Sequence, residues 1–518
     1  MYKLGIDVGG TNTDAVLIDE NLQVVAAVKN PTSGDIYMGI MGAVDAVLDE
    51  SGVDRTLIGQ AMLGTTQCTN AIVERKGLAP IAILRIGAPA TVGIPPMVGP
   101  GADDIAAVCV GRAHHRGAAS STTASAWRSS TRPRGRAFFE GVRGRVEAVA
   151  VSSVFSTVRN DDELRAAEIA REVLGEDVHV SISSEIGSMG LIERENATIL
   201  NAALYDVARR FTEGFAQSLA DKGVVNAEVY LSQNDGTLMT MEHARRYPIL
   251  TIACGPTNSI RGASYLSRRD DAIVIDVGGT TTDLGVLAHG FPRESGVAVT
   301  IGGVRTNFRM PDVVSIGLGG GSIVRVADDG TVCVGPDSVG YEIARKALVF
   351  GGDTMTATDI AVRLGMAEVG DAALVADIPQ EVAERAMDAI RALVEDAIDV
   401  MKVSSDDIDV VLVGGGAIVL PHELAGTAEV DAPEHAGCAN AIGSAISKVS
   451  GTYEALVDYD VTPRDEALAI ARAAAVDAAV EAGAVRDTVE IIDAEDVPLA
   501  YYPGHTNRVK VKAAGDLG

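Results

Sequence analysis

Two hydrophobic periodicities alternate along this chain. Short apolar runs, typical of buried strands, end in glycine-rich turns, as at residues 2–8, 272–277 and 409–413. Between them, apolar residues recur every three or four positions, which predicts helices over 35–52, 161–175 and 380–402. A longer helical face is predicted from Glu193 to Gly223 and consists of Ile199, Ala203, Val207, Phe211, Phe215 and Leu219. The chain is therefore expected to be an ordered alternation of strands and helices.

The last part of the chain has its own pattern. A helix near 463–484 is followed by strand-like residues 488–493 and 507–513. We therefore expect a small C-terminal α+β region over 451–518.

Residues 105–139 differ from their surroundings. They contain six arginines, no Asp or Glu, and the single tryptophan, Trp127. Two interpretations stay open, a basic surface insertion and a local reading-frame slip in the coding DNA, which resequencing the gene would separate. His114 and His115 are interpreted as solvated side chains and not as metal ligands.

Composition narrows the classes of function. With 518 residues the chain exceeds one ordinary hydrophobic core, so two or more domains are expected. A net charge of −28 disfavours binding to nucleic acid or anionic membranes. The five cysteines are scattered without a C-x-x-C pair, and neither a membrane span nor a signal peptide is recognisable, which favours a cytoplasmic protein.

One turn occurs twice. The segment IDVGGTNTDAVLID (6–19) is nearly repeated as IDVGGTTTDLGVLA (275–288). Paired glycines let backbone N–H groups approach an anion, threonine hydroxyls suit phosphate oxygens, and a carboxylate at a strand end can hold Mg²⁺. Asp7 and Asp276 are the predicted catalytic and metal-binding residues. The predicted phosphate-binding residues are Gly9, Gly10, Thr11, Asn12 and Thr13 in the first copy and Gly278, Gly279, Thr280, Thr281 and Thr282 in the second.

A third glycine-rich turn follows the strand-like residues 409–413. Gly414, Gly415 and Gly416 suit a close approach to a ribose or adenine. The order of the three turns resembles that of the acetate and sugar kinase, heat-shock chaperone and actin superfamily. This resemblance implies an α/β fold of two ribonuclease-H-like domains with mixed sheets, flanking a cleft for ATP.

Further segments resemble a narrower family. They are GTTQCTNAIVERKG (64–77), GLIERENATILNAAL (190–204), YPILTIACGPTNSIRGA (247–263) and VSIGLGGGSI (314–323). They are similar to hydantoinase A/5-oxoprolinase sequences, of which this chain looks like a short branch. The resemblance implies ATP-dependent opening of a cyclic amide, such as a hydantoin, oxoproline or lactam, through phosphorylation of the amide oxygen. It also implies a B-type hydantoinase subunit or a second copy of the chain as partner.

Domain limits and rival functions follow from the same resemblance. The first ATPase half is expected over 1–190, a linking helix and the second half over 191–450, and the appendix over 451–518. A small-molecule kinase and a nucleotide-switched regulatory or chaperone-like subunit remain as alternatives.

Several assignments stay open at this level. Asp14 and Asp283 either close their hairpins or act in the site. Residues 193–196 either cap a helix or line the cleft, and the loop 317–322 either faces a ligand or forms a wide turn. Cys254 is expected to be a packing residue because no base partner is recognisable. The family often has a histidine where this chain has Leu63, which puts a histidine-based metal site in doubt.

Overall fold

The computed structural model describes residues 1–9, 12–31, 36–97, 106, 108–116, 132–295, 298–499 and 504–518. The largest sheet has nine strands in the order β22-β23-β21-β10-β9-β4-β1-β2-β3. Their bounds are β1 (Tyr2–Val8), β2 (Asn12–Ile18), β3 (Val24–Pro31), β4 (Ile58–Thr65), β9 (Glu228–Ser232), β10 (Leu238–Thr240), β21 (Val449–Asp458), β22 (Glu490–Pro498) and β23 (Thr506–Gly515). Strands β1, β4 and β9 are parallel, so their carboxyl ends lie at one edge.

A second mixed sheet carries the repeated turn. Its path is β13 (Phe291–Pro292), β12 (Thr282–Ala288), β11 (Ala272–Val277), β19 (Ile408–Val413) and β20 (Thr427–Asp431), and β16 (Val313–Ile316) pairs with β12. The hairpins β1–β2 and β11–β12 have matching registers, because Asp7 lies opposite Asp14 and Asp276 lies opposite Asp283. The similar sequences therefore form the same local structure.

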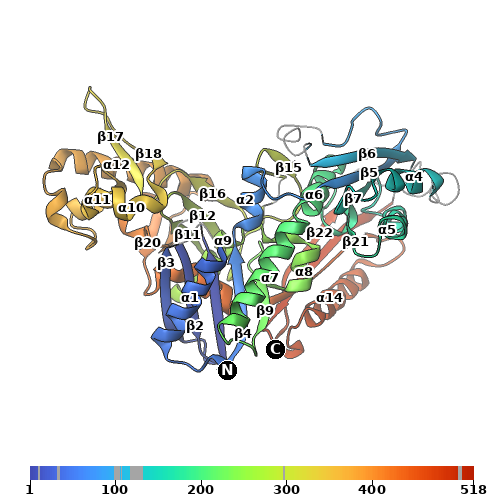
Figure 1. Ribbon diagram of the computed structural model, residues 1–518, viewed down its shortest axis with the longest axis horizontal. Helices are drawn as coiled ribbons and strands as arrows, with labels where there is room; N and C mark the ends of the chain where they lie inside the picture. The colour runs from blue at the N-terminus through green and yellow to red at the C-terminus, as the bar shows by residue number, and fades with distance from the viewer. Residues whose placement is uncertain are drawn as a thin grey trace.

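A third, all-parallel sheet lies at the right of Figure 1. It consists of β6 (Cys109–Arg116), β5 (Ile81–Ala88), β7 (Ala148–Ser153) and β8 (His179–Ile182), with α4 (Arg132–Val142) and α5 (Asp161–Leu174) packed on it. The described parts of the unusual segment 105–139 thus include a strand and a helix. Residues 117–131, including Trp127, and the side chains of His114 and His115 lie outside the described part of the chain.

Two helices lie between the large sheets, α9 (Cys254–Ser267) and α13 (Ala439–Ile446). They pack against each other through glycine. A Cβ on Gly262 would lie 1.9 Å from the carbonyl oxygen of Ala439, and one on Gly443 would lie 1.9 Å from that of Asn258. Since no side chain separates them there, the two backbones are in direct contact.

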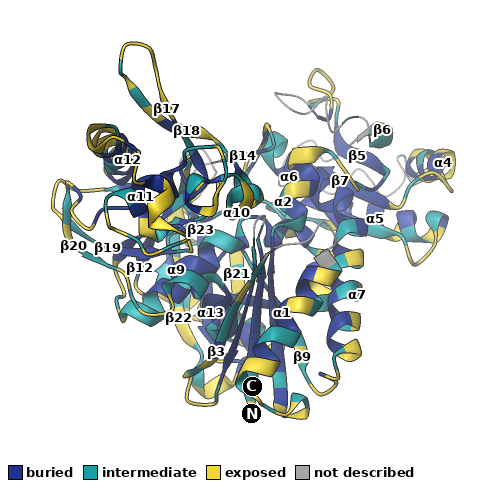
Figure 2. Cartoon of the chain, turned by 60° about the vertical axis from the view of Figure 1, so that its left-hand side comes forward, coloured by how far each residue is buried: buried dark blue, intermediate teal, exposed yellow. Residues whose placement is uncertain are grey.

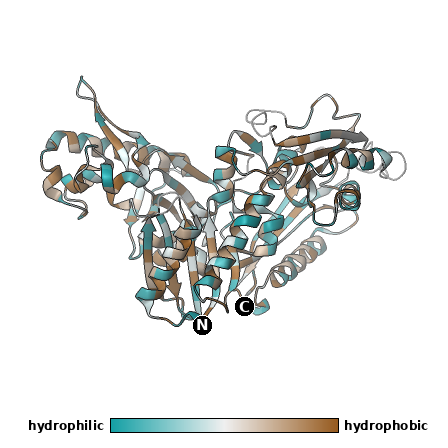
Figure 3. Ribbon diagram, in the orientation of Figure 1, coloured by the Kyte–Doolittle hydropathy of each residue, from teal (hydrophilic) through white to brown (hydrophobic). Residues whose placement is uncertain are grey.

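The outer helices follow the predicted periodicity. Helix α1 (Ile36–Ser51) buries Ile40, Ala43, Val44, Val47 and Leu48 on the first sheet, and α12 (Gln380–Met401) buries one face in the core of the second half. Figure 2 shows exposed residues on the outer sides of these helices, and Figure 3 shows the matching change from apolar to polar. The remaining helices are α2 (Gln67–Glu74), α6 (Leu191–Ala203), α7 (Tyr205–Asp221), α8 (Met241–Arg246), α10 (Ile343–Lys346), α11 (Ala357–Arg363) and α14 (Arg464–Glu481). Short hairpins are formed by β14 (Val299–Ile301) with β15 (Val304–Thr306), and by β17 (Ser322–Val326) with β18 (Val332–Ser338).

Two local features differ from the simplest sequence interpretation. The long helix expected from Glu193 to Gly223 is divided at Leu204 into α6 and α7. Strands from the 451–518 region join the nine-stranded sheet through pairing of β21 with β10, so they continue the sheet that begins with β1. Among the described residues, no helix is both long and apolar enough to cross a membrane.

Candidate functional site

Two carboxylates from different sheets are close enough for their charges to interact. Asp7 lies near the end of β1 and Asp276 near the end of β11, and the charge of Asp276 raises the pKa of Asp7. Helix α9 touches both, since it places Asn258 beside Asp7, and Ser259 donates a hydrogen bond to Asp276. Helix α9 therefore connects the two carboxylates, and the phosphate clamp expected from the two turns stays a prediction.

Each turn is closed by the same backbone hydrogen bond. Gly9 N–H donates to the Asn12 carbonyl at 3.0 Å, and Gly278 N–H donates to the Thr281 carbonyl at 2.9 Å. Thr280 and Thr281 are exposed on the second turn, whereas Thr13 and Thr282 are fully buried. The Thr282 hydroxyl donates to the Leu318 carbonyl inside the protein. Gly10 and Thr11 lie outside the described residues.

The third glycine turn packs directly on the second. Gly414 has φ +86°, and a Cβ there would lie 2.2 Å from Asp276 Oδ1, so the position requires glycine. Gly416 N–H donates to the Val277 carbonyl at 2.7 Å, while Gly415 is exposed. The predicted set Gly414, Gly415 and Gly416 therefore lies beside Asp276.

Asp7 has an incomplete set of partners. Its Oδ2 accepts a hydrogen bond from Asn440 of α13 at 2.9 Å. Its Oδ1 and both amide heteroatoms of Asn258 are buried without a hydrogen bond of normal geometry. Gly64 leaves them room, because a Cβ there would lie 2.3 Å from Asp7 Oδ1. Burial, together with the charges of Asp14 and Asp276, raises the pKa of Asp7 to about 7.

This environment fits a hard cation. A buried carboxylate oxygen without a donor is a suitable ligand for Mg²⁺, which usually takes one or two carboxylates and keeps several waters. No group of three or more His, Cys, Asp or Glu side chains forms a ready metal cage in the described part of the chain. The residues present therefore suit a cation held together with a phosphate ligand, and not a closed structural metal centre.

The other two hairpin carboxylates are also perturbed. Burial raises the pKa of Asp14, although Lys29 Nζ lies 2.6 Å from both of its oxygens and opposes that rise. Burial raises the pKa of Asp283 to about 6, and Ser315 donates a hydrogen bond to it. Both side chains are thus held by specific partners within the site region.

The loop 317–322 packs against the second turn and forms backbone hydrogen bonds to it. The N–H groups of Gly320 and Gly321 donate to the carbonyls of Gly278 and Gly279, at 3.0 and 2.8 Å. A Cβ on Gly319 would lie 2.7 Å from the backbone of Gly279 and Thr280. The glycines of this loop are required for close packing against the turn.

The motif at 193–196 is mostly interior. Glu195 is 1 % exposed and forms a bidentate ion pair with the fully buried Arg85. The same carboxylate accepts a hydrogen bond from Ser152 at 2.6 Å. Arg194 donates to the Ser153 carbonyl at 2.8 Å, so the motif joins α6 to the four-stranded sheet.

Cys254 lies close to the site but is unsuited to nucleophilic attack. Burial, with a contribution from Asp7, raises the pKa of its thiol to about 12, and the thiol donates to the Thr65 carbonyl. A thiol held in the protonated form is a poor nucleophile. Its interpretation as a packing residue agrees with this environment.

Three residues of this region escaped sequence reasoning: Lys29, Asn258 and Asn440. Lys29 ends the apolar run of β3, and the two asparagines lie inside helices. Asn258 belongs to the family-like segment 247–263, but no role was assigned to it from the sequence. The Lys29–Asp14 pair could have been found by assuming a hairpin of β2 and β3, since Lys29 lies opposite Asp14 in its register.

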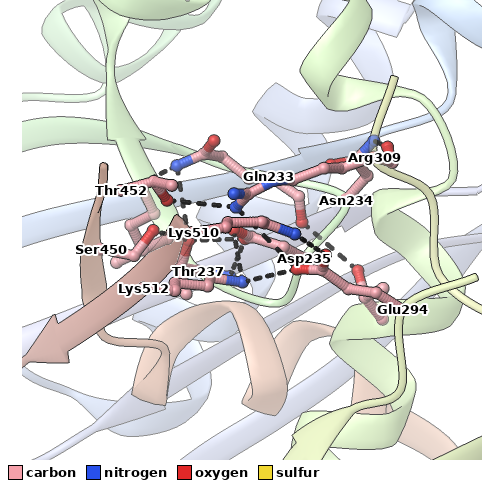
Figure 4. Close-up of polar contacts among 12 residues, drawn as sticks. Gln233, Asn234, Asp235, Thr237, Glu294, Arg309, Ser450, Thr452, Lys510 and Lys512 are labelled. Carbon is pink, nitrogen blue, oxygen red and sulfur yellow. Dashed lines mark hydrogen bonds and ion pairs between the residues drawn. The ribbon is translucent and has the colours of Figure 1, made fainter. Parts of the chain in front are cut away.

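A second polar cluster joins the second half to the nine-stranded sheet (Figure 4). Glu294 Oε1 lies 3.1 Å from Lys512 Nζ, and its Oε2 lies 3.2 Å from Lys510 Nζ. Lys512 also pairs with Asp235 at 2.8 Å, and Arg309 donates to Thr452 at 3.1 Å. Burial favours the neutral form of Glu294, but Lys512, Arg309 and Lys510 together hold its pKa well below the usual range.

Comparison with known proteins identifies the family. Residues 3–174 match the model of the hydantoinase/oxoprolinase N-terminal region, and residues 194–369 match the hydantoinase/oxoprolinase model. The chain belongs to the hydantoinase/oxoprolinase family. Within it, the chain is 27% identical over 435 residues to the caprolactamase subunit alpha of Pseudomonas jessenii, covering 77% of this chain and 59% of that one. It is also 27% identical over 402 residues to the acetophenone carboxylase gamma subunit of Aromatoleum aromaticum, covering 70% of this chain and 53% of that one.

Two solved structures confirm the mixed α/β fold. The ATP-dependent caprolactamase from Pseudomonas jessenii aligns with a TM-score of 0.76 at 19% identity, covering 100% of this chain and 88% of that one. A nucleotide-free acetone carboxylase aligns with a TM-score of 0.69 at 18% identity, with the same coverages. The chain spans little more than half the length of the first curated relatives that it matches.

Proposed function

We propose that this chain is an ATP-dependent hydrolase, or a subunit of one, that opens a cyclic amide such as a hydantoin, oxoproline or lactam. The observation that carries the proposal is the convergence of Asp7, Asp276 and the 414–416 turn at one place between two sheets. Membership of the hydantoinase/oxoprolinase family and the similarity to a caprolactamase subunit support the substrate class.

An amide carbonyl carbon is a poor electrophile, and phosphorylation of the amide oxygen by ATP would activate it. The amide oxygen attacks the terminal phosphorus of ATP, which forms an O–P bond and releases ADP. A first water adds to the activated carbon, the C–N bond breaks, and the ring nitrogen leaves as an amine after taking a proton, which gives an acyl phosphate. A second water then releases phosphate and leaves the carboxylate.

The described residues supply positioning and charge. Asp7 and Asp276 would hold Mg²⁺, which neutralises phosphate charge during transfer. The turns 9–13 and 278–282 would bind the phosphates from two sides, and the 414–416 turn would lie against the nucleoside. Relatives named as subunits support a partner chain or a homo-oligomer.

The test is an ATPase screen with hydantoins, oxoproline and lactams, in which ADP and the ring-opened acid are both measured. We expect Asp7→Ala and Asp276→Ala to lower turnover at least about 100-fold, since phosphoryl transfer depends on charge neutralisation. Asp388→Ala, at an exposed carboxylate, is the matched control. Unchanged turnover in both site variants would overturn the assignment of the site.

A second candidate reaction is favoured by the two carboxylase subunits among the relatives. The same screen therefore includes a ketone with bicarbonate. A carboxylated ketone in place of a ring-opened acid would identify that reaction, and a stable phosphoester would identify a kinase.

A further inference from the structure

Lys29 lies where the elements of the candidate site meet. It is on β3, opposite Asp14 in the β2–β3 register, so both side chains lie on one face of the sheet. Its Nζ is 2.6 Å from both Asp14 oxygens. The Lys29 side chain is 32% exposed, whereas that of Asp14 is 3% exposed. The pair thus has its carboxylate inside the protein and its ammonium at the surface of the site.

The same lysine reaches the other half of the molecule. A Cβ on Gly415 would lie 3.6 Å from Lys29 Cε and 4.0 Å from its Nζ. The charge of Lys29 also lowers the pKa of Asp7 and of Asp276, in opposition to burial. One ammonium therefore acts on both hairpins and lies against the third glycine turn.

Lys29 is surrounded by acidic side chains, and this charge balance bears on how the site could bind a phosphate. Within the described part of the chain, Lys29 is the one cation in an ion pair with any of the carboxylates of Asp7, Asp14, Asp276 and Asp283. A polyphosphate that enters here meets four acidic groups. Divalent metal can offset two of them, but the outermost phosphoryl oxygens still require a donor, because their charge is redistributed during transfer.

We propose that Lys29 contacts the terminal phosphate of the nucleotide and that Asp14 is the residue that holds it in position. On binding, Lys29 Nζ keeps one bond to Asp14 and turns another N–H toward the phosphate, which its three donors permit. Lys29 is then a catalytic residue, and Asp14 is a positioning residue. This inference rests on the proposed ATP-dependent function and adds to it the group that recognises the third phosphate.

The alternative is that Lys29 only neutralises a buried aspartate. The two roles predict different effects on the affinities for ADP and ATP. A structural ion pair affects stability and treats ADP and ATP alike, whereas a contact to the terminal phosphate affects the ratio of their affinities.

The experiment measures dissociation constants of MgADP and of the Mg²⁺ complex of a non-hydrolysable ATP analogue by calorimetry on the full chain. The variants are Lys29→Arg, Asp14→Asn, and the double variant Lys29→Met with Asp14→Asn, which avoids leaving Asp14 buried without a partner. We expect the preference for the analogue over ADP to fall at least about tenfold in the double variant. Asp14→Asn alone should lose part of that preference, because Lys29 keeps its charge but loses the carboxylate that positions it, and Lys29→Arg should keep most of it.

An unchanged ratio in the double variant, with ADP still bound, would overturn the role of Lys29 and leave the proposed function standing. An Asp14→Asn variant that keeps the full wild-type preference for the analogue would overturn the positioning role of Asp14. A wild-type chain that binds neither nucleotide would overturn both proposals. Failure to open any cyclic amide bears on the proposed function alone.

Discussion

The repeated aspartates show how burial sets the chemistry of single residues. Asp7 and Asp276 are close enough that the charge of Asp276 raises the pKa of Asp7, and burial raises the pKa of both, although Asp276 is only partly buried. A divalent cation between them would supply the opposite charge that the described residues provide only through Lys29. Ionisation of this pair and metal binding are therefore expected to be coupled.

A pH dependence follows for Asp7. Its folded-state pKa, about 7, is above the usual value for an unfolded aspartate, so without metal its contribution to stability is present at low pH and is lost as pH rises from about 4 to about 7. Mg²⁺ affinity should rise over the same range, because the metal binds the carboxylate. Calorimetric titration with Mg²⁺ between pH 5.5 and 8.5 measures this.

The Asp7→Asn variant is the comparison for that titration. It should lose the part of the pH dependence near pH 7 and keep a weaker part from Asp283, whose pKa is about 6. An identical pH profile in wild type and variant would show that Asp7 is not a ligand.

At the scale of elements, glycines govern how helices and sheets approach. Gly5 on β1 lies so close to α13 that a Cβ would be 2.3 Å from the Ala441 carbonyl oxygen, and Gly262 and Gly443 bring α9 against α13. These helices carry Asn258, Ser259 and Asn440 to the two carboxylates. The geometry of the site therefore depends on backbone contacts between elements far apart in sequence.

Replacement of Gly262 by alanine should force α9 and α13 apart. We expect a loss of about 1–3 kcal/mol in the free energy of unfolding, as for other over-packed cores, together with weaker nucleotide binding. Gly255→Ala on the same helix is the matched control, because no atom lies within 4 Å of its Cβ position. Denaturant unfolding of the two variants decides the point, and equal stability would show that the helices can separate without cost.

At the scale of the whole molecule, charged residues connect the second half to the end strand of the chain. Glu294 follows β13, and its partners Lys510 and Lys512 lie on β23 of the nine-stranded sheet. The two lysines are 7% and 4% exposed, so they depend on that carboxylate and on Asp235 for their charge balance. The cluster is therefore a charged contact between the segment after β13 and the nine-stranded sheet.

Removal of the Glu294 charge should weaken this connection. We expect Glu294→Gln to lower the free energy of unfolding by about 2 kcal/mol, less than for a fully buried pair because Glu294 is 25% exposed. Glu381→Gln, in an exposed pair with Arg385, should change it by less than about 1 kcal/mol.

The effect of pH on stability through Glu294 is opposite in sign to the effect through Asp7. Because the folded-state pKa of Glu294 is lowered, its stabilising contribution is present above its unfolded value, about 4.3, and is lost as pH falls further. Wild type should therefore lose stability on acidification below about pH 4 more steeply than Glu294→Gln. Parallel acid unfolding curves would contradict this.

The sequence predicted what is encoded locally. The strands on either side of the two DVGGT segments and the periodicity of α1, α5 and α12 depend on neighbouring residues, and the structure contains each of these strands and helices. The roles assigned to the turn residues stay predictions. The pairing of β21 with β10 and the position of Lys29 were not predicted. The pattern of apolar residues identifies a strand but does not show which other strand it pairs with. The division at Leu204 was missed because the apolar spacing continues unbroken across it.

The bare contact between α9 and α13 also bears on motion. Backbone meets backbone at Gly262 and Gly443, while Tyr265 and Leu266 of α9 pack in one cluster with Ala441 and Ile442 of α13, so any sliding along this contact is limited to small displacements. Because α9 touches both Asp7 and Asp276, a ligand that draws those carboxylates together would also act on this contact. Closure of the two halves would then be a shear along the helix axes, with small displacements, and not a swing about a loop.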